Sequence, residues 1–209
     1  GGIADLPAGW TDHQEPARYR LERRSDEALF GFAVGPYSWK RFLHPPMETL
    51  WTAQQDGDKL TIKAPLATSP RYALLGVRAC EIHAIAIQDR VFRDGPYIDT
   101  GYAARRRDAF IVAVNCGQAG ATCFCVSMQT GPKAESGFDL ALTELLDTRG
   151  HRFLVEAGSP AGAAMLATLP RATAAPDDQA AAEAIVARTA AQMGRTLDTS
   201  GLKELLQAN

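Results

Sequence analysis

Two short apolar runs, residues 72–77 and 109–115, mark the middle of the chain. Apolar runs of this length that are bounded by glycine, proline or charge are typical of buried strands. Between them, apolar residues recur at helical spacing over residues 82–91, and the Gly-Pro pair at 95–96 ends this helix. Because a strand–helix–strand crossover is right-handed, we expect the two strands to be parallel neighbours.

The first 70 residues contain shorter apolar segments separated by polar turns. Residues 19–23 and 28–34 flank an Arg-Ser-Asp-Glu turn, and this pattern predicts one hairpin. Residues 50–53 and 60–64 flank an Asp-Gly-Asp turn, which predicts a second hairpin. We therefore expect a β-rich N-terminal segment over residues 1–70.

The last third of the chain changes from strand to helix. Residues 138–145 and 152–156 flank an Asp-Thr-Arg-Gly turn and predict an antiparallel hairpin, although the leucine spacing in 138–145 also suits a helix. From residue 158 the sequence is rich in alanine and predicts a helical tail. The expected helices of this tail are 161–169, 176–194 and about 199–208.

Together these elements predict an α/β (α+β) fold with a mixed sheet and a central βαβ unit. The expected division is a β-rich N-terminal part (1–70), an α/β core that carries the cysteines (71–157) and a helical C-terminal tail (158–209). A chain of 209 residues is long enough to bury a sizeable core, so we expect these parts to form one compact domain.

Composition and charge exclude several classes of protein. Apolar residues make up 46% of the chain and charged residues 22%, as in ordinary soluble domains. The net charge of −2 provides no basic surface for nucleic acid or an anionic membrane. The basic run at 105–107 is interpreted as a solvated loop. No apolar stretch is long enough for a membrane span or resembles a signal segment, so we expect a cytoplasmic protein.

Four cysteines fall near the ends of the predicted central strands. Cys80 follows strand 72–77 at the start of a helix, where the helix dipole would lower its thiol pKa. Cys116 follows the second strand, and Cys123 and Cys125 flank Phe124 in a C-x-C within a polar loop. The carboxyl ends of parallel strands share the edge where open α/β sheets bind ligands. We therefore expect Cys80, Cys116, Cys123 and Cys125 to bind one metal centre or iron–sulfur cluster.

The spacing C-x35-C-x6-C-x-C leaves the kind of centre open. It matches neither the ferredoxin cysteine runs nor the paired C-x2-C of structural zinc sites. One thiolate per iron suits a [4Fe–4S] cluster, but a [2Fe–2S] cluster also takes four thiolates. The alternatives are a zinc-stabilised structural or interaction domain, a thiol redox protein that uses the C-x-C pair, and ordinary buried cysteines. A disulfide within the C-x-C would be strained, so reduced thiols are expected.

Three neighbouring residues are candidates for a supporting role. Arg78 could offset the charge of a cluster or hold a partner carboxylate, or it could be solvated at the edge of the sheet. His83, one turn into the helix, could support the site or be an exposed helix residue. Phe124 would shield a cluster from water. Because G-x-S-x-G, P-loop and G-x-G-x-x-G motifs are absent, we expect no catalytic residue.

Several segments resemble one family of iron–sulfur electron-transfer proteins. Residues 75–85 (Leu-Gly-Val-Arg-Ala-Cys-Glu-Ile-His-Ala-Ile) resemble its G-V-R-x-C-[DE]-x-x-A-[IL] segment. Residues 115–116 and 120–125 resemble its N-C and G-x-T-C-F-C segments, and 35–40 also fits. This is the 4Fe–4S dicluster domain-containing group, similar to sulfhydrogenase β subunits and to the A subunit of anaerobic sulfite reductase. The resemblance covers most of residues 19–205.

The resemblance implies an electron-transfer module that performs no bond chemistry itself. Its partners would be a downstream ferredoxin-like domain and a redox catalytic subunit. Members usually continue into a domain with two ferredoxin-type cysteine runs, which these 209 residues lack, so the resemblance implies an N-terminal domain. Ala79 and Glu81 stand where proline and aspartate are expected, and the four cysteines are unaffected. The supporting residues are then Arg78, His83, Asn115, Thr122 and Phe124.

Overall fold

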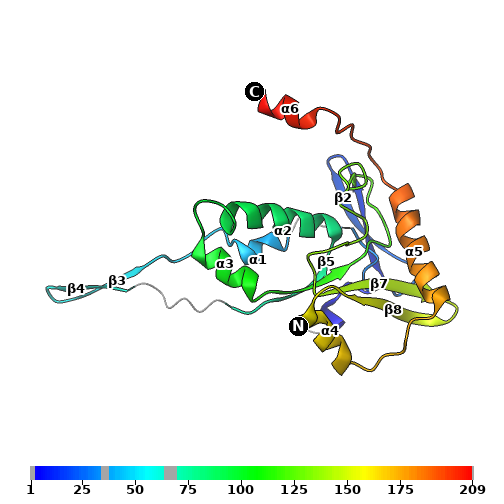
Figure 1. The fold of residues 1–209 in the computed structure, drawn as a ribbon, viewed down its shortest axis with the longest axis horizontal. Coiled ribbons are helices and arrows are strands. Elements are labelled where there is room, and N and C mark those ends of the chain that lie inside the picture. Colours follow the sequence, from blue (N-terminus) through cyan, green and yellow to red (C-terminus); the bar gives the residue numbers. More distant parts are fainter. Residues whose placement is uncertain (1–2, 34–37, 64–69, 209) are drawn as a thin grey trace.

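The computed structural model describes residues 3–33, 38–63 and 70–208, and the elements below lie within these ranges. In chain order the elements are η1 (Ile3–Asp5), β1 (Trp10–Glu15), β2 (Arg18–Arg23), α1 (Lys40–Leu43), β3 (Thr52–Asp56), β4 (Lys59–Lys63), β5 (Ala73–Val77), α2 (Ala79–Phe92), α3 (Thr100–Arg107), β6 (Phe110–Val114), β7 (Leu140–Asp147), β8 (Gly150–Ala157), α4 (Pro160–Thr168), α5 (Pro176–Ala191) and α6 (Leu202–Gln207). The fold is therefore mixed α/β with a helical C-terminal region (Figure 1).

The main sheet has four strands in the order β5-β6-β7-β8. The strands β5, β6 and β7 run parallel, and β7 and β8 form an antiparallel hairpin. These pairings confirm the predicted mixed sheet, the central βαβ unit and the antiparallel hairpin predicted for residues 138–156. The helical alternative for residues 138–145 is wrong, because β7 pairs with β8 from Leu140 to Asp147.

An apolar core lies between the sheet and the helices α2 and α3. From the helices it includes Ile82, Ile85 and Tyr102, which are almost completely buried. The sheet contributes Leu74, Val77, Ile111, Ala113 and Ala141. Burial of each large apolar side chain stabilises the fold by roughly 1.5–3 kcal/mol relative to exposure. This core fixes α2 against the sheet and so fixes the position of its first turn.

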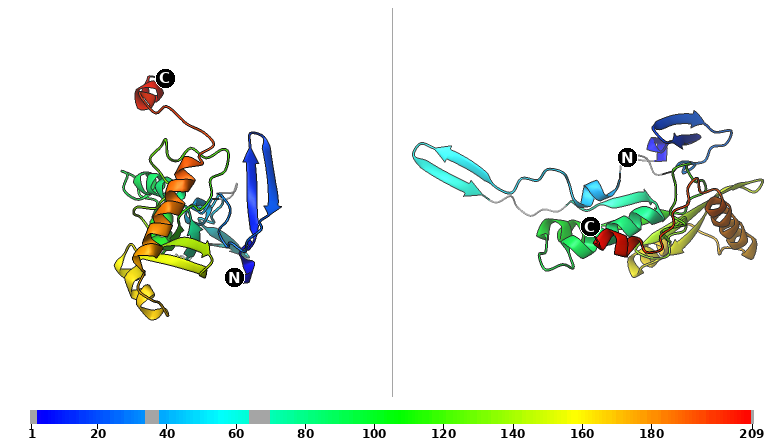
Figure 2. Two further views of the ribbon diagram at one scale, coloured as in Figure 1. Left: turned by 90° about the vertical axis from the view of Figure 1, so that its right-hand side faces the viewer. Right: turned by 90° about the horizontal axis from the view of Figure 1, so that it is seen from above.

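Residues of β7 alternate between the two faces of the sheet. Ala141 lies in the core with α2, and Thr143, on the same face, lies beneath α5. Glu144 faces the other side, where its carboxylate accepts hydrogen bonds from the backbone N–H groups of Leu29 (2.6 Å) and Phe30 (2.9 Å). The β1–β2 hairpin thus lies on the side of the sheet opposite to the helices α2 and α3 (Figure 2).

The first predicted hairpin is wrong, because its first strand pairs with a different segment. The strand at 19–23 exists as part of β2, but it pairs with β1 rather than with residues 28–34. Within that segment, residues 28–33 form no strand, and Val34 lies outside the described residues. Carboxylates satisfy much of its backbone, since Glu144 caps residues 29 and 30 and Asp12 accepts from Ala33 N (2.6 Å). Its apolar side chains are buried, which explains the strand-like pattern: Ala28, Phe30 and Ala33.

The second N-terminal hairpin is confirmed. Strands β3 and β4 pair from Thr52 and Lys63 to Asp56 and Lys59, around the predicted Asp-Gly turn. Residue 64 of this prediction lies outside the described residues. Figure 1 shows the hairpin as an arm that extends away from the rest of the molecule.

The basic run at 105–107 is not a solvated loop. It forms the last turn of α3, where cations are favoured by the helix dipole. Arg105 is buried and donates hydrogen bonds to the Leu43 carbonyl (2.7 Å) and to Glu48 (2.9 Å). A charge run that looks like a surface segment therefore joins α3 to the chain that follows α1.

The C-terminal region is helical as predicted, although α5 ends at Ala191 rather than at Gly194. Helices α4 and α5 lie against β8 and β7, and α6 stands apart from the sheet (Figure 1). None of the helices in the described ranges is both long and apolar enough to cross a membrane.

Candidate functional site

The four cysteines lie along the carboxyl edge of the parallel strands β5 and β6. Cys80 is the second residue of α2, which begins directly after β5. Cys116 lies two residues beyond the end of β6, and Cys123 and Cys125 lie in the loop that connects β6 to β7. All four are free thiols of intermediate accessibility. The predicted placement at this edge is confirmed, although ligation of a cluster remains a prediction.

A β-bulge in β5 directs the chain toward this edge of the sheet. The register of β5 shifts between Leu75 and Val77, at Gly76, whose φ of +93° is unfavourable for other residues. A Cβ at this position would also lie 3.4 Å from the ring of Phe30. Gly76 therefore lets the strand turn toward the first residues of α2 while residues 28–33 pack closely beneath it.

The C-x-C loop lies close to the first turn of α2. A Cβ placed on Gly131 would lie 3.3 Å from Ala79 Cβ and 3.3 Å from Cys125 Sγ, so these two atoms are at most twice that distance apart. Burial raises the pKa of Cys80 to about 12, with smaller contributions from negative charge on Cys116, Cys125, Glu81 and Cys123. The other three thiols therefore lie within electrostatic range of Cys80.

The thiol pKa values correct one expectation. The dipole at the start of α2 does not lower the pKa of Cys80, because desolvation by burial dominates. Burial likewise raises the pKa of Cys125 to about 11 and raises the pKa of Cys116, which the charge of Arg78 opposes. These three thiols are protonated at neutral pH in the protein alone. A metal ion or cluster that binds them must therefore displace protons.

Thiols are suitable ligands for a soft metal centre, but the four cysteines are not arranged as a coordination shell around a single metal ion. Across residues 3–33, 38–63 and 70–208, no three His, Cys, Asp or Glu side chains form a group that could hold a metal ion. Sulfur donors are the type that iron–sulfur clusters and other soft centres select.

Backbone hydrogen bonds fold the cysteine loop back on itself. Cys116 N donates to the Pro132 carbonyl (3.2 Å), which joins the beginning of the loop to its end. Thr130 N donates to the Cys125 carbonyl (2.9 Å) and closes a smaller turn around the C-x-C. The loop is thereby held in shape without a helix or a strand between Cys116 and Cys125.

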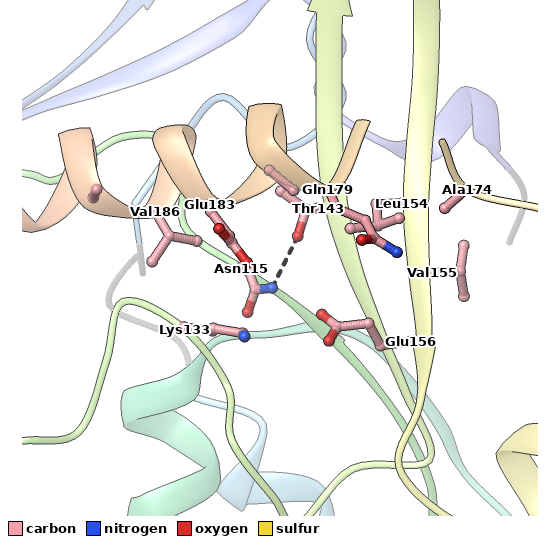
Figure 3. Close-up of a pocket in the computed structure, with 12 residues that line it drawn as sticks. Asn115, Lys133, Thr143, Leu154, Val155, Glu156, Ala174, Gln179, Glu183 and Val186 are labelled. Carbon is pink, nitrogen blue, oxygen red and sulfur yellow. Dashed lines mark hydrogen bonds between the residues drawn. The ribbon is translucent and has the colours of Figure 1, made fainter. Parts of the chain in front are cut away.

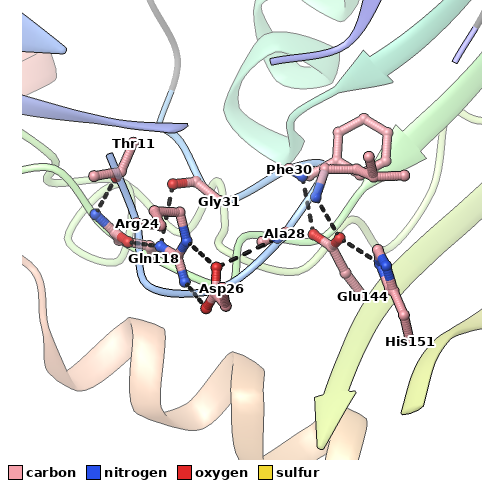
Figure 4. Close-up of polar contacts among 10 residues, drawn as sticks. Thr11, Arg24, Asp26, Ala28, Phe30, Gly31, Gln118, Glu144 and His151 are labelled. Carbon is pink, nitrogen blue, oxygen red and sulfur yellow. Dashed lines mark hydrogen bonds and ion pairs between the residues drawn. The ribbon is translucent and has the colours of Figure 1, made fainter. Parts of the chain in front are cut away.

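The β1–β2 hairpin supports the loop from outside. Thr122 Oγ1 donates to Gln14 Oε1 (2.9 Å), and Gln118 Nε2 donates to Thr11 Oγ1 (2.8 Å). Arg24 in turn donates to Gln118 Oε1 (2.7 Å), as Figure 4 shows. Of these residues the sequence analysis selected Thr122 alone, because β1 was not predicted and the contacts span about half of the chain.

A segment after α5, residues 193–197, lies along the C-x-C loop. Arg195 N donates to the Cys123 carbonyl (3.1 Å), and Leu197 N donates to Ser127 Oγ (3.0 Å). Sequence reasoning missed this segment, because its short run of mixed residues has no periodic pattern.

The same segment brings a second kind of sulfur, a thioether, to the site. Met193 Sδ lies 3.8 Å from Cys125 Sγ. The next residue, Gly194, approaches the loop so closely that a Cβ would lie 2.1 Å from the Ala121 carbonyl oxygen. A glycine at the end of a predicted helix is the one signal in the sequence that could have indicated this close approach.

The residues predicted to support the site differ in their burial and contacts. Arg78 is almost completely buried and bonds to backbone carbonyls, so its interpretation as a solvated arginine is wrong. Asn115 is also buried: its side-chain amide donates to Thr143 Oγ1 (2.9 Å), and its Oδ1 accepts from Ala134 N (2.8 Å). His83 is exposed on α2, as the alternative for this residue held.

Phe124 does not close the site off from solvent. Its side chain is 43% exposed, and Val126 and Met128 on the same loop are 41% and 40% exposed. An apolar patch therefore adjoins the thiols on the outside of the loop.

Asn115 also borders a pocket of about 410 Å³ between α5 and the sheet (Figure 3). Lys133, Glu156 and Glu183 bring charges of both signs to its wall, which also includes Thr143. This pocket could not be predicted from the sequence, because its residues come from at least five separate segments with no shared motif.

The fold and the site define a mixed α/β domain that gathers four thiols at the carboxyl edge of a βαβ unit. Over 158 residues, or 69% of this chain, the sequence is 30% identical to the protein named Sulfhydrogenase 2 subunit beta of Pyrococcus furiosus. The match covers 43% of that protein, so the chain spans less than half the length of this curated relative. No protein-family model matches the chain. No solved structure matches it either.

Proposed function

We propose that this chain transfers electrons as a domain of an iron–sulfur redox subunit. In this proposal Cys80, Cys116, Cys123 and Cys125 bind one [4Fe–4S] cluster. The observation that carries the proposal is the convergence of thiols from three separate segments on one edge of the sheet, within electrostatic range of Cys80. Similarity to a sulfhydrogenase subunit supports a redox complex as the setting.

When bound, the cluster would supply a one-electron redox centre. The chain's own residues have the tasks of binding and enclosing it. The hydrogen bonds that close the loop between Cys116 and Pro132 hold the ligands in place, and residues 193–197 cover one side. No described residue is assigned a role in making or breaking covalent bonds.

The exposed patch of Phe124, Val126 and Met128 is the proposed contact with the next redox partner. Electron transfer between centres needs a short path, and this loop carries two of the four thiols. The proposed partners are a ferredoxin-like domain and a redox catalytic subunit. Exposed apolar patches on domains of this kind mark interaction sites. Hydrogen exchange of the loop should slow when a ferredoxin-like domain is added, and unchanged exchange would contradict this role.

Anaerobic purification followed by iron, sulfide and zinc analysis tests the proposal. The expected result is about four irons and four sulfides per chain, with a broad visible absorption that is lost on reduction. Two irons per chain would indicate a [2Fe–2S] cluster. Zinc without iron would favour a structural zinc site. An exchangeable disulfide with no metal would favour thiol redox chemistry at the C-x-C pair.

A further inference from the structure

Arg78 is the most completely buried charged residue of the described chain, with 1% of its surface exposed. It is the N-cap residue of α2 and precedes Cys80 by two positions. Its guanidinium donates hydrogen bonds to the carbonyls of Phe30 (2.9 Å), Phe32 (2.8 Å), Val114 (3.4 Å) and Asn115 (3.3 Å). The side chain thereby joins the N-terminal segment to the end of β6.

These partners satisfy hydrogen bonds but carry no opposite charge. All four are neutral carbonyls, and the ring of Phe32 lies 5.2 Å from the guanidinium carbon. Among the residues that the structure describes, no carboxylate forms a salt bridge with Arg78, and its Nε atom is buried without a partner. Buried charge is costly unless an opposite charge balances it, so such an arrangement favours an anion nearby.

The thiol site is where such an anion would form. Two of the bonded carbonyls, Val114 and Asn115, lead directly into Cys116, and the charge of Arg78 lowers the pKa of the Cys116 thiol, against the effect of burial. Glu81, on the same helix turn, lies within electrostatic range of Arg78, but its carboxylate accepts its hydrogen bonds from the backbone N–H groups of Arg78 and Trp39. The positive charge therefore lies between the segment of Cys80 and the segment of Cys116.

We propose that Arg78 is the counter-charge of the thiol site and raises the reduction potential of the cluster bound there. This inference rests on the proposed function. A cluster held by four thiolates is anionic, and each electron that it accepts makes it more negative. A fixed positive charge in a medium of low dielectric stabilises the reduced state more than the oxidised state.

The test is an anaerobic reductive titration with dithionite, followed by visible absorption and electron paramagnetic resonance. One electron passes from dithionite to the site, and no bond forms or breaks. Arg78→Gln removes the charge but keeps a donor for the carbonyls, and Arg78→Lys keeps the charge but loses the planar fork. The matched control is Arg105→Gln, another buried arginine bonded to a backbone carbonyl, whose charge is balanced by Glu48.

We expect Arg78→Gln to shift the midpoint potential to a more negative value, Arg78→Lys to shift it less, and Arg105→Gln to leave it unchanged. If Arg78→Gln holds a cluster at the wild-type potential, the inference is overturned and the proposed function stands. Loss of the cluster in Arg78→Gln but not in Arg78→Lys would support a requirement for the charge. Equal loss in both variants would show that the hydrogen-bond geometry matters instead. Wild-type protein without any cluster would overturn the proposed function and this inference with it.

Discussion

The two ends of helix α2 both contain buried charged side chains, but they balance that charge in different ways. Near the C-terminal end, the carboxylate of Asp89 accepts from Tyr102 Oη (2.7 Å) and pairs with Arg106 (3.1 Å) and Arg93 (3.5 Å). At the N-terminal end, the guanidinium of Arg78 donates its hydrogen bonds to four neutral backbone carbonyls.

This difference separates a structural role from a candidate functional one. A network in which opposite charges already meet gains little from any further ligand, and its worth lies in holding α3 on α2. A buried charge whose partners are all neutral lowers the stability of the isolated domain, and this cost is offset only when an anion occupies the site. Changes at the two ends should therefore alter different measurements.

The largest effect is expected from the thiols themselves. Cys116→Ser or Cys123→Ser should remove most of the bound iron, because three thiolates leave one iron of the cluster open to solvent and oxygen. Iron and sulfide content after anaerobic purification provides the measurement. Met128→Leu is the matched control, since it removes a sulfur from the same loop without removing a thiol. Full iron content in both serine variants would contradict the proposed ligand set.

The opposite end of α2 should respond in stability alone. Asp89→Ala leaves the cations of Arg93 and Arg106 without their carboxylate and removes the partner of the buried Tyr102 hydroxyl. We expect the free energy of unfolding in urea to fall by about 3 kcal/mol, with iron content per folded chain unchanged. Loss of iron at unchanged stability would show that the two ends of α2 are not separable in this way.

The sequence predicted the two ends of α2 with unequal success. The run ending at Val77, the helix after it and the strand at 110–114 have continuous or periodic apolar patterns, so Cys80 and Cys116 could be placed from the sequence. The buried pattern of residues 28–33 was mistaken for a strand, because side-chain carboxylates rather than a neighbouring strand satisfy its backbone. The roles of Arg78 and Arg105 depend on contacts with residues more than 30 positions away, and no local pattern records them.

Residues 193–197, which lie outside α2, provide a further test of the difference between the two ends of this helix. Gly194→Val would place side-chain atoms against the Ala121 carbonyl, so the segment must move away from the C-x-C loop. We expect a loss of roughly 1–3 kcal/mol in stability and faster bleaching of the visible absorption in air. Leu206→Ala, an exposed change further along the tail, is the control. Bleaching at the wild-type rate would show that this segment does not protect the thiol end.

The smallest effect is expected where opposite charges meet in full contact with water, at the turn between β7 and β8. The hydrogen bonds from Arg152 hold the pKa of Asp147 at about 2, below its usual value. Because the folded pKa is the lower one, the stabilising contribution is present above about pH 4, the usual value for aspartate, and disappears as the pH falls through about 2. Asp147→Asn should therefore lower stability slightly at neutral pH, by less in high salt, and by progressively less as the pH falls through about 2. Urea unfolding of both proteins across this range measures the difference, and Asp58→Asn on the exposed β3–β4 turn is the control. A difference that is as large at pH 2 as at neutral pH would mean that shape rather than charge matters at this turn, and that charge balance distinguishes regions of this molecule only where water is excluded.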